Sequence, residues 1–326
     1  MTDMDRRGLL AGALASPILA GAARAAADPA PQTSIRLWPN DAPGLQNGAL
    51  TDHIVDRTIA GGPRDRAYDS IRTPRLDVFP AETPNGAAVL ITPGGGYARV
   101  VIDKEGYELA AWLQARGITA FVLFYRLPAQ GWADPADTPL ADAQRAIRLI
   151  RARAAEWRVD PARVATIGFS AGGHLCADGC TRFDRRVYAP IDAADALSAR
   201  PMLAAPIYPV IAMESPIAHT ASRANLLGHH AVPADLVEHA PDQQVRADTP
   251  PCFLVHAEDD GTVPVENSVR FRAALKAAGV PVEMHLFERG GHGFGLRGAA
   301  HLPAAGWPDL WHAWAAGHGL FGASAR

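Results

Sequence analysis

The stretch VATIGFSAGGHLCA (residues 164–177) joins a short apolar run to a helix-compatible run and sets Ser170 between glycines at the junction. The apolar run has the length and character of a buried strand. The order of strand, Gly168-Phe169-Ser170-Ala171-Gly172 and helix predicts a sharp turn that lifts the serine above the edge of a sheet. A Gly-x-Ser-x-Gly pattern also arises by chance in glycine-rich chains, so a small residue in a tight turn is the alternative. Features elsewhere in the chain are needed to distinguish a nucleophile from a turn residue.

Short apolar runs recur along the chain and alternate with longer helical patterns. Seven runs rich in Val, Ile and Phe are predicted as strands, namely residues 75–79, 87–92, 119–125, 163–169, 202–208, 252–257 and 282–288. Most of them are apolar on both faces, as is required of strands that helices cover on either side. We therefore predict an α/β fold with a mostly parallel central sheet of about eight strands, covered by helices on both faces in a three-layer sandwich.

The helices between these strands have recognisable ends, most clearly at residues 103–117, 138–157 and 264–279. In the second of these, Thr138 is predicted as the N-cap and Pro139 as the first helical residue, because those residue types favour those positions. Residues 209–250 show neither a clear strand nor a clear helix. A long insertion of this kind in a compact domain indicates a binding loop or a small lid.

The first 27 residues, MTDMDRRGLLAGALASPILAGAARAAA, have a charged start, an apolar middle and an end of small residues. This pattern predicts an export signal. Arg6 and Arg7 before the apolar run are similar to the twin-arginine type, and residues 23–25 or 25–27 supply an A-x-A cleavage pattern. An uncleaved anchor or a tail without structure is the alternative. We expect a periplasmic or secreted protein with no stable membrane insertion after removal of the signal.

Composition favours one globular domain over residues 28–326, since 48% of the 326 residues are hydrophobic and 20% are charged. The net charge is -3 and the Lys and Arg residues are scattered, so nucleic acid is not an expected partner. The odd count of cysteines, Cys176, Cys180 and Cys252, allows at most one internal disulfide, and we expect the first two to be buried on the helix after Ser170. Ligand spacings typical of metal sites are missing from the sequence, so neither a metal nor a cofactor is predicted.

A serine hydroxyl becomes a useful nucleophile only when a histidine takes its proton and a carboxylate holds that histidine in one tautomer. The segment FLVHAEDDGTVPVENS (residues 253–268) supplies a group of acids between a predicted strand and a predicted helix. Loop ends of this kind are where open α/β sheets display functional groups. Glu258, Asp259 and Asp260 are the candidates, and a solvated turn is the alternative.

The candidate base is His292, which lies among four glycines in HLFERGGHGFGLRG (residues 285–298). Flanking glycines let a loop bring an imidazole close to Ser170 without side-chain clashes. His174 lies four residues after Ser170 on the predicted helix, so we expect it to be a hydrogen-bonded helix residue. The predicted chain order is therefore serine, acid, histidine.

An acyl-transfer site also needs donors for the oxyanion of the tetrahedral intermediate. LITPGGGYARV (residues 90–100) places three glycines at the end of a predicted strand, in the position of the loop that complements the serine turn. We assign the backbone N–H groups of Gly95 and Gly96, together with that of Ala171, to this task. The segment lacks the Lys-Ser/Thr of a phosphate-binding loop and the spacing of a dinucleotide fingerprint.

With these motifs in place, the chain resembles the α/β-hydrolase superfamily, and within it the exported carbohydrate esterases related to acetyl xylan and feruloyl esterases, many of which are labelled endo-1,4-β-xylanase B-like. The resemblance spans nearly the whole chain after the predicted signal. The matching segments are IRLWPNDAPG (35–44), PGGGY (93–97), KEGYELAAWLQARGITAFVLFYRLP (104–128), DAQRAIRLIRARAAEW (142–157), IGFSAGGHL (167–175), HAEDDGTVPVENS (256–268) and GGHGFG (290–295).

The resemblance implies particular residues for each role. Ser170 would be the nucleophile and His292 the base. Asp260 would be the acid, because it directly precedes the Gly-Thr-Val-Pro turn where the family places its carboxylate, and Asp259 is the second choice. Pro93 stands where related lipases have the histidine of an HGGG loop, which sets the chain outside the hormone-sensitive-lipase-like branch.

The predicted chemistry is ester hydrolysis, with acetyl or another small acyl group removed from a small-molecule or polysaccharide ester. Glycoside hydrolysis generally needs two facing carboxylates, and no such pair stands out. A serine peptidase of the prolyl-oligopeptidase type and a non-catalytic binding protein are the alternatives. Tyr97, Arg126 and Trp132 are predicted to contact substrate, since an aromatic platform suits a sugar ring, with core packing as the other interpretation.

Overall fold

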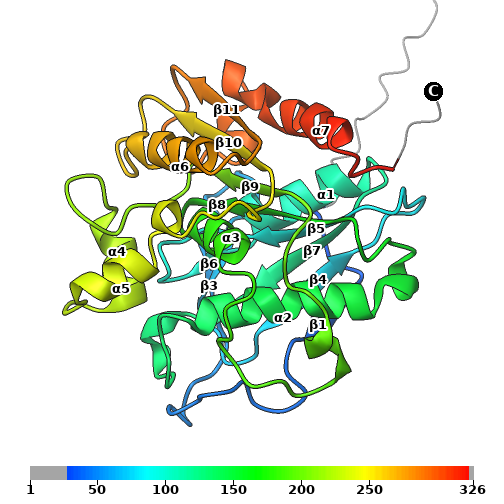
Figure 1. The fold of residues 1–326 in the computed structure, drawn as a ribbon. Coiled ribbons are helices and arrows are strands. Elements are labelled where there is room, and N and C mark those ends of the chain that lie inside the picture. Colours follow the sequence, from blue (N-terminus) through cyan, green and yellow to red (C-terminus); the bar gives the residue numbers. More distant parts are fainter. Residues whose placement is uncertain (1–27, 323–326) are drawn as a thin grey trace, which may run out of the picture.

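The computed structural model describes residues 28–322, so the predicted export signal lies outside the described residues. Its main element is a sheet of eight strands (Figure 1). In spatial order these are β1 (Thr33–Arg36), β4 (Arg75–Phe79), β7 (Thr119–Phe124), β5 (Ala88–Thr92), β8 (Val164–Phe169), β9 (Ala204–Ile207), β10 (Cys252–Ala257) and β11 (Val282–Phe287). All seven predicted strands are present within a residue or two of their expected bounds, and β1 is the additional one.

Most of the sheet is parallel. Only β4 runs against its two neighbours, β1 and β7, and the strands from β7 to β11 are parallel to one another. Every residue of β5, β7, β8, β9 and β10 is buried, which requires cover on both faces of the sheet. The predicted α/β class with a mostly parallel sheet of eight strands is confirmed.

The helices gather in groups around this sheet. They are α1 (Glu108–Gln114), α2 (Thr138–Ala152), α3 (Ser170–Thr181), α4 (Thr220–Leu227), α5 (Pro233–Glu238), α6 (Glu266–Ala277) and α7 (Trp307–Gly317). Figure 1 shows α2 beside α3, and α1 near α7, where the rings of Trp112 and His312 meet edge to face at 6.3 Å. A π-helical turn, η1 (Asp103–Tyr107), leads into α1. The predicted helix over residues 103–117 therefore comprises two elements.

The start of α2 differs from the expectation. Asp137 occupies the N-cap position, so Thr138 and Pro139 are the first and second helical residues. The Asp137 carboxylate does not cap the helix, because it accepts a 2.8 Å hydrogen bond from Arg182. The Thr138 hydroxyl donates to the carbonyl of Asp134 at 2.8 Å. A long-range ion pair has replaced the local cap that the sequence predicted.

A second, small antiparallel sheet was not predicted. It contains β2 (His53–Asp56), β3 (Arg66–Ser70) and β6 (Val100–Val101), in the order β2-β3-β6. These strands are short and mix polar with apolar residues, so their sequences show no clear hydrophobic periodicity. β6 lies between the glycine loop (residues 93–97) and η1. Its pairing with β3 therefore fixes the position of both segments.

The three cysteines are free and buried, and all belong to the apolar cluster between α3, α6 and β10. Burial raises the pKa of the Cys176 thiol well above its usual range, which keeps it protonated and inert. The expectation that Cys176 and Cys180 are buried is confirmed. Among residues 28–322, no helix has the length and hydropathy needed to span a bilayer.

Candidate active site

Ser170 lies at the turn between β8 and α3, and it carries the unusual backbone conformation of that turn. Its φ of 54° is in the left-handed region, which is strained for a residue with a Cβ. Neither Gly168 nor Gly172 has a positive φ. These glycines are required by close approach instead: a Cβ on Gly168 would collide with the carbonyl of Gly172, and one on Gly172 with the carbonyls of Thr92 and Pro93. The glycines thus allow strand and helix to approach each other closely at the turn, where Ser170 is buried but lines a cavity.

Three predicted residues from distant parts of the chain meet at this turn. The Ser170 Oγ lies 2.8 Å from Nε2 of His292, and Nδ1 of His292 lies 2.7 Å from Oδ2 of Asp260. Because a carboxylate only accepts hydrogen bonds, Nδ1 of His292 carries the hydrogen and Nε2 presents its lone pair to the serine hydroxyl. This is the geometry that a serine nucleophile with a general base requires.

Asp260 is held as an anion by donors on both of its oxygens. Oδ1 accepts from the backbone N–H groups of Thr262 and Val263, each at 2.9 Å. Oδ2 accepts from His292 and, at 3.2 Å, from Nε2 of His256. Burial by itself raises the pKa of Asp260, but the hydrogen bonds from His256 and His292 outweigh it and hold the pKa below the usual range. The carboxylate is therefore charged whenever His292 needs it.

His256 is a second histidine on the acid that sequence reasoning did not identify. Its Nε2 faces two acceptors, Oδ2 of Asp260 and the carbonyl of Val263 at 3.0 Å, so Nε2 carries the hydrogen. Its Nδ1 accepts from the Ser268 hydroxyl at 2.8 Å. The only signal in the sequence was its position four residues before Asp260, at the end of a predicted strand.

The second candidate for the acid, Asp259, has another position. Its Oδ1 accepts from the backbone N–H groups of Gly290 and Gly291 at 2.9 and 2.7 Å. Asp259 therefore fastens the loop that carries His292 and does not contact the imidazole. The structure brings Asp260, the first choice, to His292.

The glycine loop after β5 borders Ser170. Gly95 and Gly96 line the same cavity as Ser170, and within residues 28–322 their N–H groups donate to no protein acceptor. The N–H of Ala171 is also free of intrahelical partners, because it belongs to the first turn of α3. The N–H of Gly94, in contrast, donates to Oε2 of Glu105 at 2.9 Å. Three unpaired donors thus lie beside the nucleophile.

Glu105 is a buried carboxylate that links the glycine loop to the loop that carries His292 (residues 290–295, here called the histidine loop). Its Oε2 holds the N–H of Gly94, and its Oε1 accepts from the hydroxyl of Tyr208 at 2.9 Å. The same hydroxyl accepts from the N–H of Gly295 at 3.0 Å. Burial and the nearby Glu105 raise the pKa of Tyr208 well above its usual value, so its hydroxyl stays protonated and able to donate. Glu105 occurs in the sequence as one acid of an apparent helix start, which concealed this role.

We expect the replacement Glu105→Ala to lower kcat for ester hydrolysis by about 10-fold or more with a smaller change in KM, because it frees the loop that presents the oxyanion donors. Glu105→Gln keeps one acceptor oxygen and should lose less. The measurement is steady-state kinetics on p-nitrophenyl acetate for both variants. If Glu105→Ala changed only the melting temperature and left kcat intact, Glu105 would be structural and not a positioning residue.

The structure does not place the three expected substrate contacts in the cavity. Tyr97, Arg126 and Trp132 are 1%, 2% and 3% exposed, and none lines the space beside Ser170. Arg126 forms a 2.9 Å ion pair with Asp142, and Trp132 donates to the carbonyl of Leu127 at 3.1 Å. Buried polar groups require hydrogen-bond partners, and Arg126 and Trp132 have theirs in the core and not in the cavity.

Tyr97 has a structural task next to the site. Its hydroxyl donates to Nδ1 of His174 at 2.7 Å, and Nε2 of His174 donates to the carbonyl of His239 at 2.8 Å. Desolvation lowers the pKa of His174, in keeping with a neutral imidazole that accepts at one nitrogen and donates at the other. The expectation that His174 is a hydrogen-bonded helix residue is confirmed. This chain of bonds ties the glycine loop to α3.

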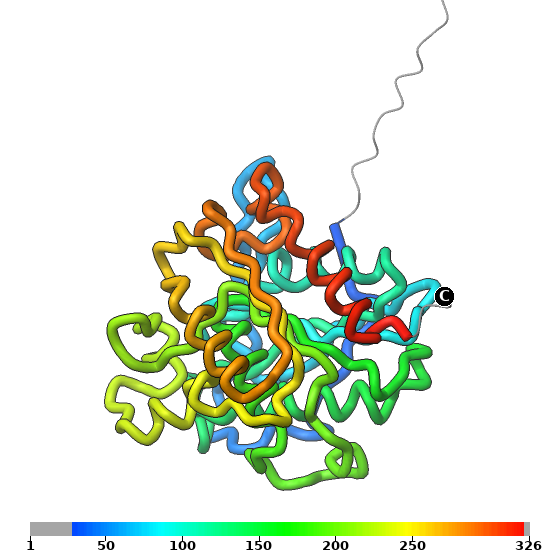
Figure 2. Tube along the Cα trace, turned by 45° about the horizontal axis from the view of Figure 1, so that its top comes forward, coloured from blue at the N-terminus to red at the C-terminus, as the bar shows by residue number. Residues whose placement is uncertain are grey.

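Residues 209–250, the predicted lid, form α4 and α5, which lie together at one edge of the molecule (Figures 1 and 2). The segment borders the cavity through His219 and Asn225, and the side-chain amide of Asn225 donates to the carbonyl of Gly96 at 2.8 Å. The Nδ1 of His219 is 2.8 Å from the hydroxyl of Ser222 and also accepts from the Ser222 N–H. Burial and the nearby His292 lower the pKa of His219, so its neutral ring offers an Nε2–H donor at the cavity.

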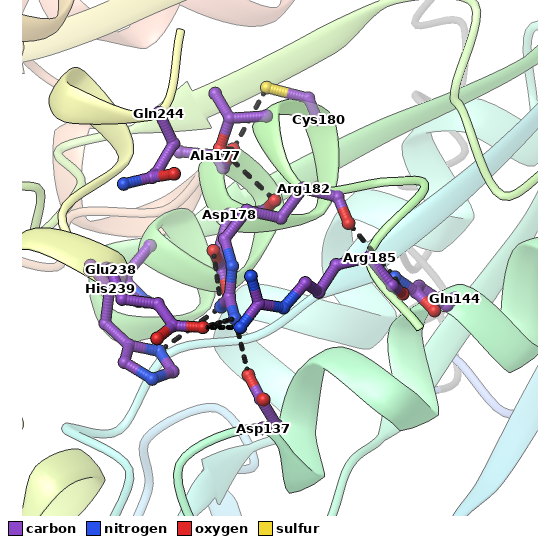
Figure 3. Close-up of polar contacts among 12 residues, drawn as sticks. Asp137, Gln144, Ala177, Asp178, Cys180, Arg182, Arg185, Glu238, His239 and Gln244 are labelled. Atoms are coloured by element: carbon purple, nitrogen blue, oxygen red, sulfur yellow. Dashed lines mark hydrogen bonds and ion pairs between the residues drawn. The ribbon is translucent and has the colours of Figure 1, made fainter. Parts of the chain in front are cut away.

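A buried arginine fastens the end of this segment to the serine helix (Figure 3). Arg182, at the end of α3, makes ion pairs with Asp178 of α3 at 3.1 Å, with Asp137 before α2 at 2.8 Å and with Glu238 of α5 at 3.2 Å. A buried cation is stable only when it is paired, so these contacts hold the three helices in one arrangement. The α5 part of the predicted lid is therefore anchored, and the role of residues 209–250 as a lid stays a prediction.

Comparison with known proteins adds a family match and related sequences. Residues 76–275 match the BD-FAE family. An acetylxylan esterase of Xylanibacter ruminicola is 33% identical over 222 residues, covering 67% of this chain and 43% of that protein. An endo-1,4-beta-xylanase B of Butyrivibrio fibrisolvens is 36% identical over 205 residues, covering 63% of this chain and 32% of that protein. The chain thus spans less than half the length of these two relatives.

A solved structure matches over almost its full length. It is the acetyl ester-xyloside bifunctional hydrolase of Caldicellulosiruptor lactoaceticus, with 35% identity and a TM-score of 0.74. The match covers 90% of this chain and 98% of that one. This match agrees with the resemblance that the sequence motifs indicated.

Proposed function

The chain belongs to the BD-FAE family, and from this premise we propose that it is a serine carboxylic-ester hydrolase that removes acetyl or other small acyl groups from a carbohydrate. The observation that carries the proposal is the pair of consecutive hydrogen bonds from Ser170 to His292 at 2.8 Å and from His292 to Asp260 at 2.7 Å. The alternative of a non-catalytic binding protein does not require this alignment.

The proposed reaction proceeds through an acyl-enzyme. Ser170 Oγ attacks the ester carbonyl while its proton passes to Nε2 of His292. When the tetrahedral intermediate collapses, the protonated His292 gives this proton to the departing sugar oxygen. Water then attacks the acyl group on Ser170 while His292 takes a proton from the water. When the bond to Ser170 Oγ breaks, His292 returns this proton to Oγ and the carboxylic acid leaves. Asp260 stabilises the imidazolium that forms in both steps.

The oxyanion of the intermediate would be bound by the unpaired N–H groups of Gly95, Gly96 and Ala171. These donors are fixed before substrate arrives, because Glu105 and Asn225 hold the loop through the N–H of Gly94 and the carbonyl of Gly96. Donors that need no rearrangement during the reaction stabilise developing charge most effectively.

Acetylated carbohydrate is the substrate class that the relatives favour, since the names of two of them refer to acetyl esters. Two names also refer to xylanase or xyloside hydrolysis. A glycosidase needs two carboxylates across the sugar bond. In the described part of the chain, Glu105 is the only carboxylate that lines the cavity, and both of its oxygens already accept hydrogen bonds. We therefore propose ester hydrolysis without glycosidase activity.

A substrate panel tests this proposal. Wild type and Ser170→Ala are assayed on p-nitrophenyl acetate, p-nitrophenyl butyrate, methyl ferulate, acetylated xylan and p-nitrophenyl β-xyloside. We expect Ser170-dependent release of acetate from the acetyl esters and no nitrophenol from the xyloside. Faster release of ferulate than of acetate would contradict the acyl assignment. Hydrolysis of the xyloside that Ser170→Ala retains would contradict the exclusion of glycosidase chemistry.

We also propose that residues 1–27 direct export and are removed, on the strength of the Arg6-Arg7 pair and the A-x-A patterns. Export would place the enzyme where polymeric carbohydrate is accessible. N-terminal sequencing of the protein recovered outside the cytoplasm should begin close to residue 26 or 28. An intact N-terminus in that fraction would contradict cleavage.

A further inference from the structure

The cavity beside Ser170 is more basic than the protein around it. The chain as a whole has a net charge of -3, yet the lining of this cavity of about 400 Å³ includes Arg57, Arg99 and Lys104. The only carboxylate in the described lining is Glu105, which is already bound to Gly94 and Tyr208. One wall of the proposed active site therefore carries an excess of positive charge.

These three cations come from the small sheet and from the turn that follows it. Arg57 directly follows β2, Arg99 directly precedes β6, and Lys104 lies in η1 shortly after β6. Because both pairings are antiparallel, β2 and β6 run in the same direction on either side of β3, and Arg57 and Arg99 belong to opposite ends of this short sheet. All three cations nevertheless line the same cavity. The cationic wall thus lies next to the sheet that the sequence did not predict.

Two of the three cations have no ion-pair partner among the described residues. Arg57 lies 3.2 Å from Asp65, which neutralises it. Across residues 28–322, neither Arg99 nor Lys104 makes an ion pair or a side-chain hydrogen bond, although the neighbouring Arg66 is bound to Asp103 at 2.7 Å. Unpaired like charges that line one cavity repel each other, and an anion bound between them relieves that repulsion.

Both unpaired cations lie close to the reacting groups. The stem of Arg99 covers Gly95, since a Cβ on Gly95 would be 2.6 Å from Cγ of Arg99. The ammonium of Lys104 lies beside the histidine loop, 3.8 Å from where a Cβ of Gly293 would be. Arg99 and Lys104 line the same cavity as Ser170, so a substrate with its ester at Ser170 shares that cavity with both cations.

We propose that the substrate ester carries a carboxylate and that Arg99 and Lys104 bind it, which makes an acetylated uronic acid the preferred substrate. This inference rests on the proposed function. A guanidinium matches the two oxygens of a carboxylate, and an ammonium adds a compact charge. A uronic acid is the sugar type that has a carboxylate within one ring of the ester.

The test compares two esters that differ only in this group, an O-acetylated methyl glucuronoside and the corresponding O-acetylated methyl glucoside. We expect kcat/KM for the uronate to exceed that for the glucoside by about 10-fold in wild type, the effect of one hydrogen-bonded charge pair. The preference should shrink in high salt, which screens partly exposed charges. It should approach unity in the double variant Arg99→Gln, Lys104→Gln.

Lys276→Gln is the matched control, because it removes one positive charge from α6 and this residue does not line the cavity. The preference should persist in this variant. A wild-type ratio of one or below, or a preference that the double variant retains, would overturn the proposal. If the wild-type enzyme cleaved the glucoside ester as fast as the uronate, the ester hydrolase function would stand and only the carboxylate preference would fall. Failure to cleave either sugar ester would reject both.

Discussion

Replacing Ser170 with alanine should lower kcat/KM for p-nitrophenyl acetate by about 10³-fold or more, because the variant retains the oxyanion donors but lacks the attacking oxygen. His292→Ala should lower it by a similar factor. The double variant should lose little beyond either single one, since nucleophile and base act as a unit. The measurement is initial-rate kinetics on all three variants with an enzyme-free blank.

The fold should survive these changes, which makes the activity loss interpretable. The Ser170 side chain makes its described hydrogen bond only to His292, and it does not cap α3, because the N-cap position belongs to Phe169. We expect the melting temperature of Ser170→Ala to stay within a few degrees of wild type, as is usual for substitutions that create no cavity. Activity that persists in this variant would eliminate the serine mechanism.

Asp260→Asn should lower kcat by about 10³- to 10⁴-fold, although the side chain keeps its shape. An amide has one donor end and one acceptor end, whereas the Asp260 carboxylate accepts on both oxygens. If the amide nitrogen faces His292, the imidazole must accept at Nδ1 and carry its hydrogen on Nε2. The ring then has no lone pair for the Ser170 hydroxyl.

Asp259→Asn is the matched control for this prediction. Its Oδ1 accepts from two backbone N–H groups and can do so equally well as an amide oxygen. We expect only a small decrease in kcat from this variant. A larger decrease in kcat from Asp259→Asn than from Asp260→Asn would show that Asp259, and not Asp260, is the carboxylate on which His292 depends. Because the lowered pKa of Asp260 keeps it ionised, activity lost on mild acidification should not come from this carboxylate.

Local sequence was sufficient to predict much of the architecture and the central residues. The buried strands appear as continuous apolar runs, because a sheet covered on both faces needs apolar residues at successive positions. Ser170, Asp260 and His292 each occupy a turn after a strand, and parallel strands bring their carboxyl ends to one edge. These patterns depend on neighbours in the chain, so they can be recognised without the fold.

The surroundings of the site were decided by tertiary structure. Arg126 was predicted to contact substrate, but it pairs with Asp142 in the core. Arg99 and Lys104 line the cavity and make no ion pair within residues 28–322. The contact between Glu105 and Tyr208 spans 103 residues. Whether a polar side chain serves the core or the cavity depends on which partners the fold brings within hydrogen-bonding distance, because a buried charge is stable only when paired. Such partners are distant in sequence and follow no local period.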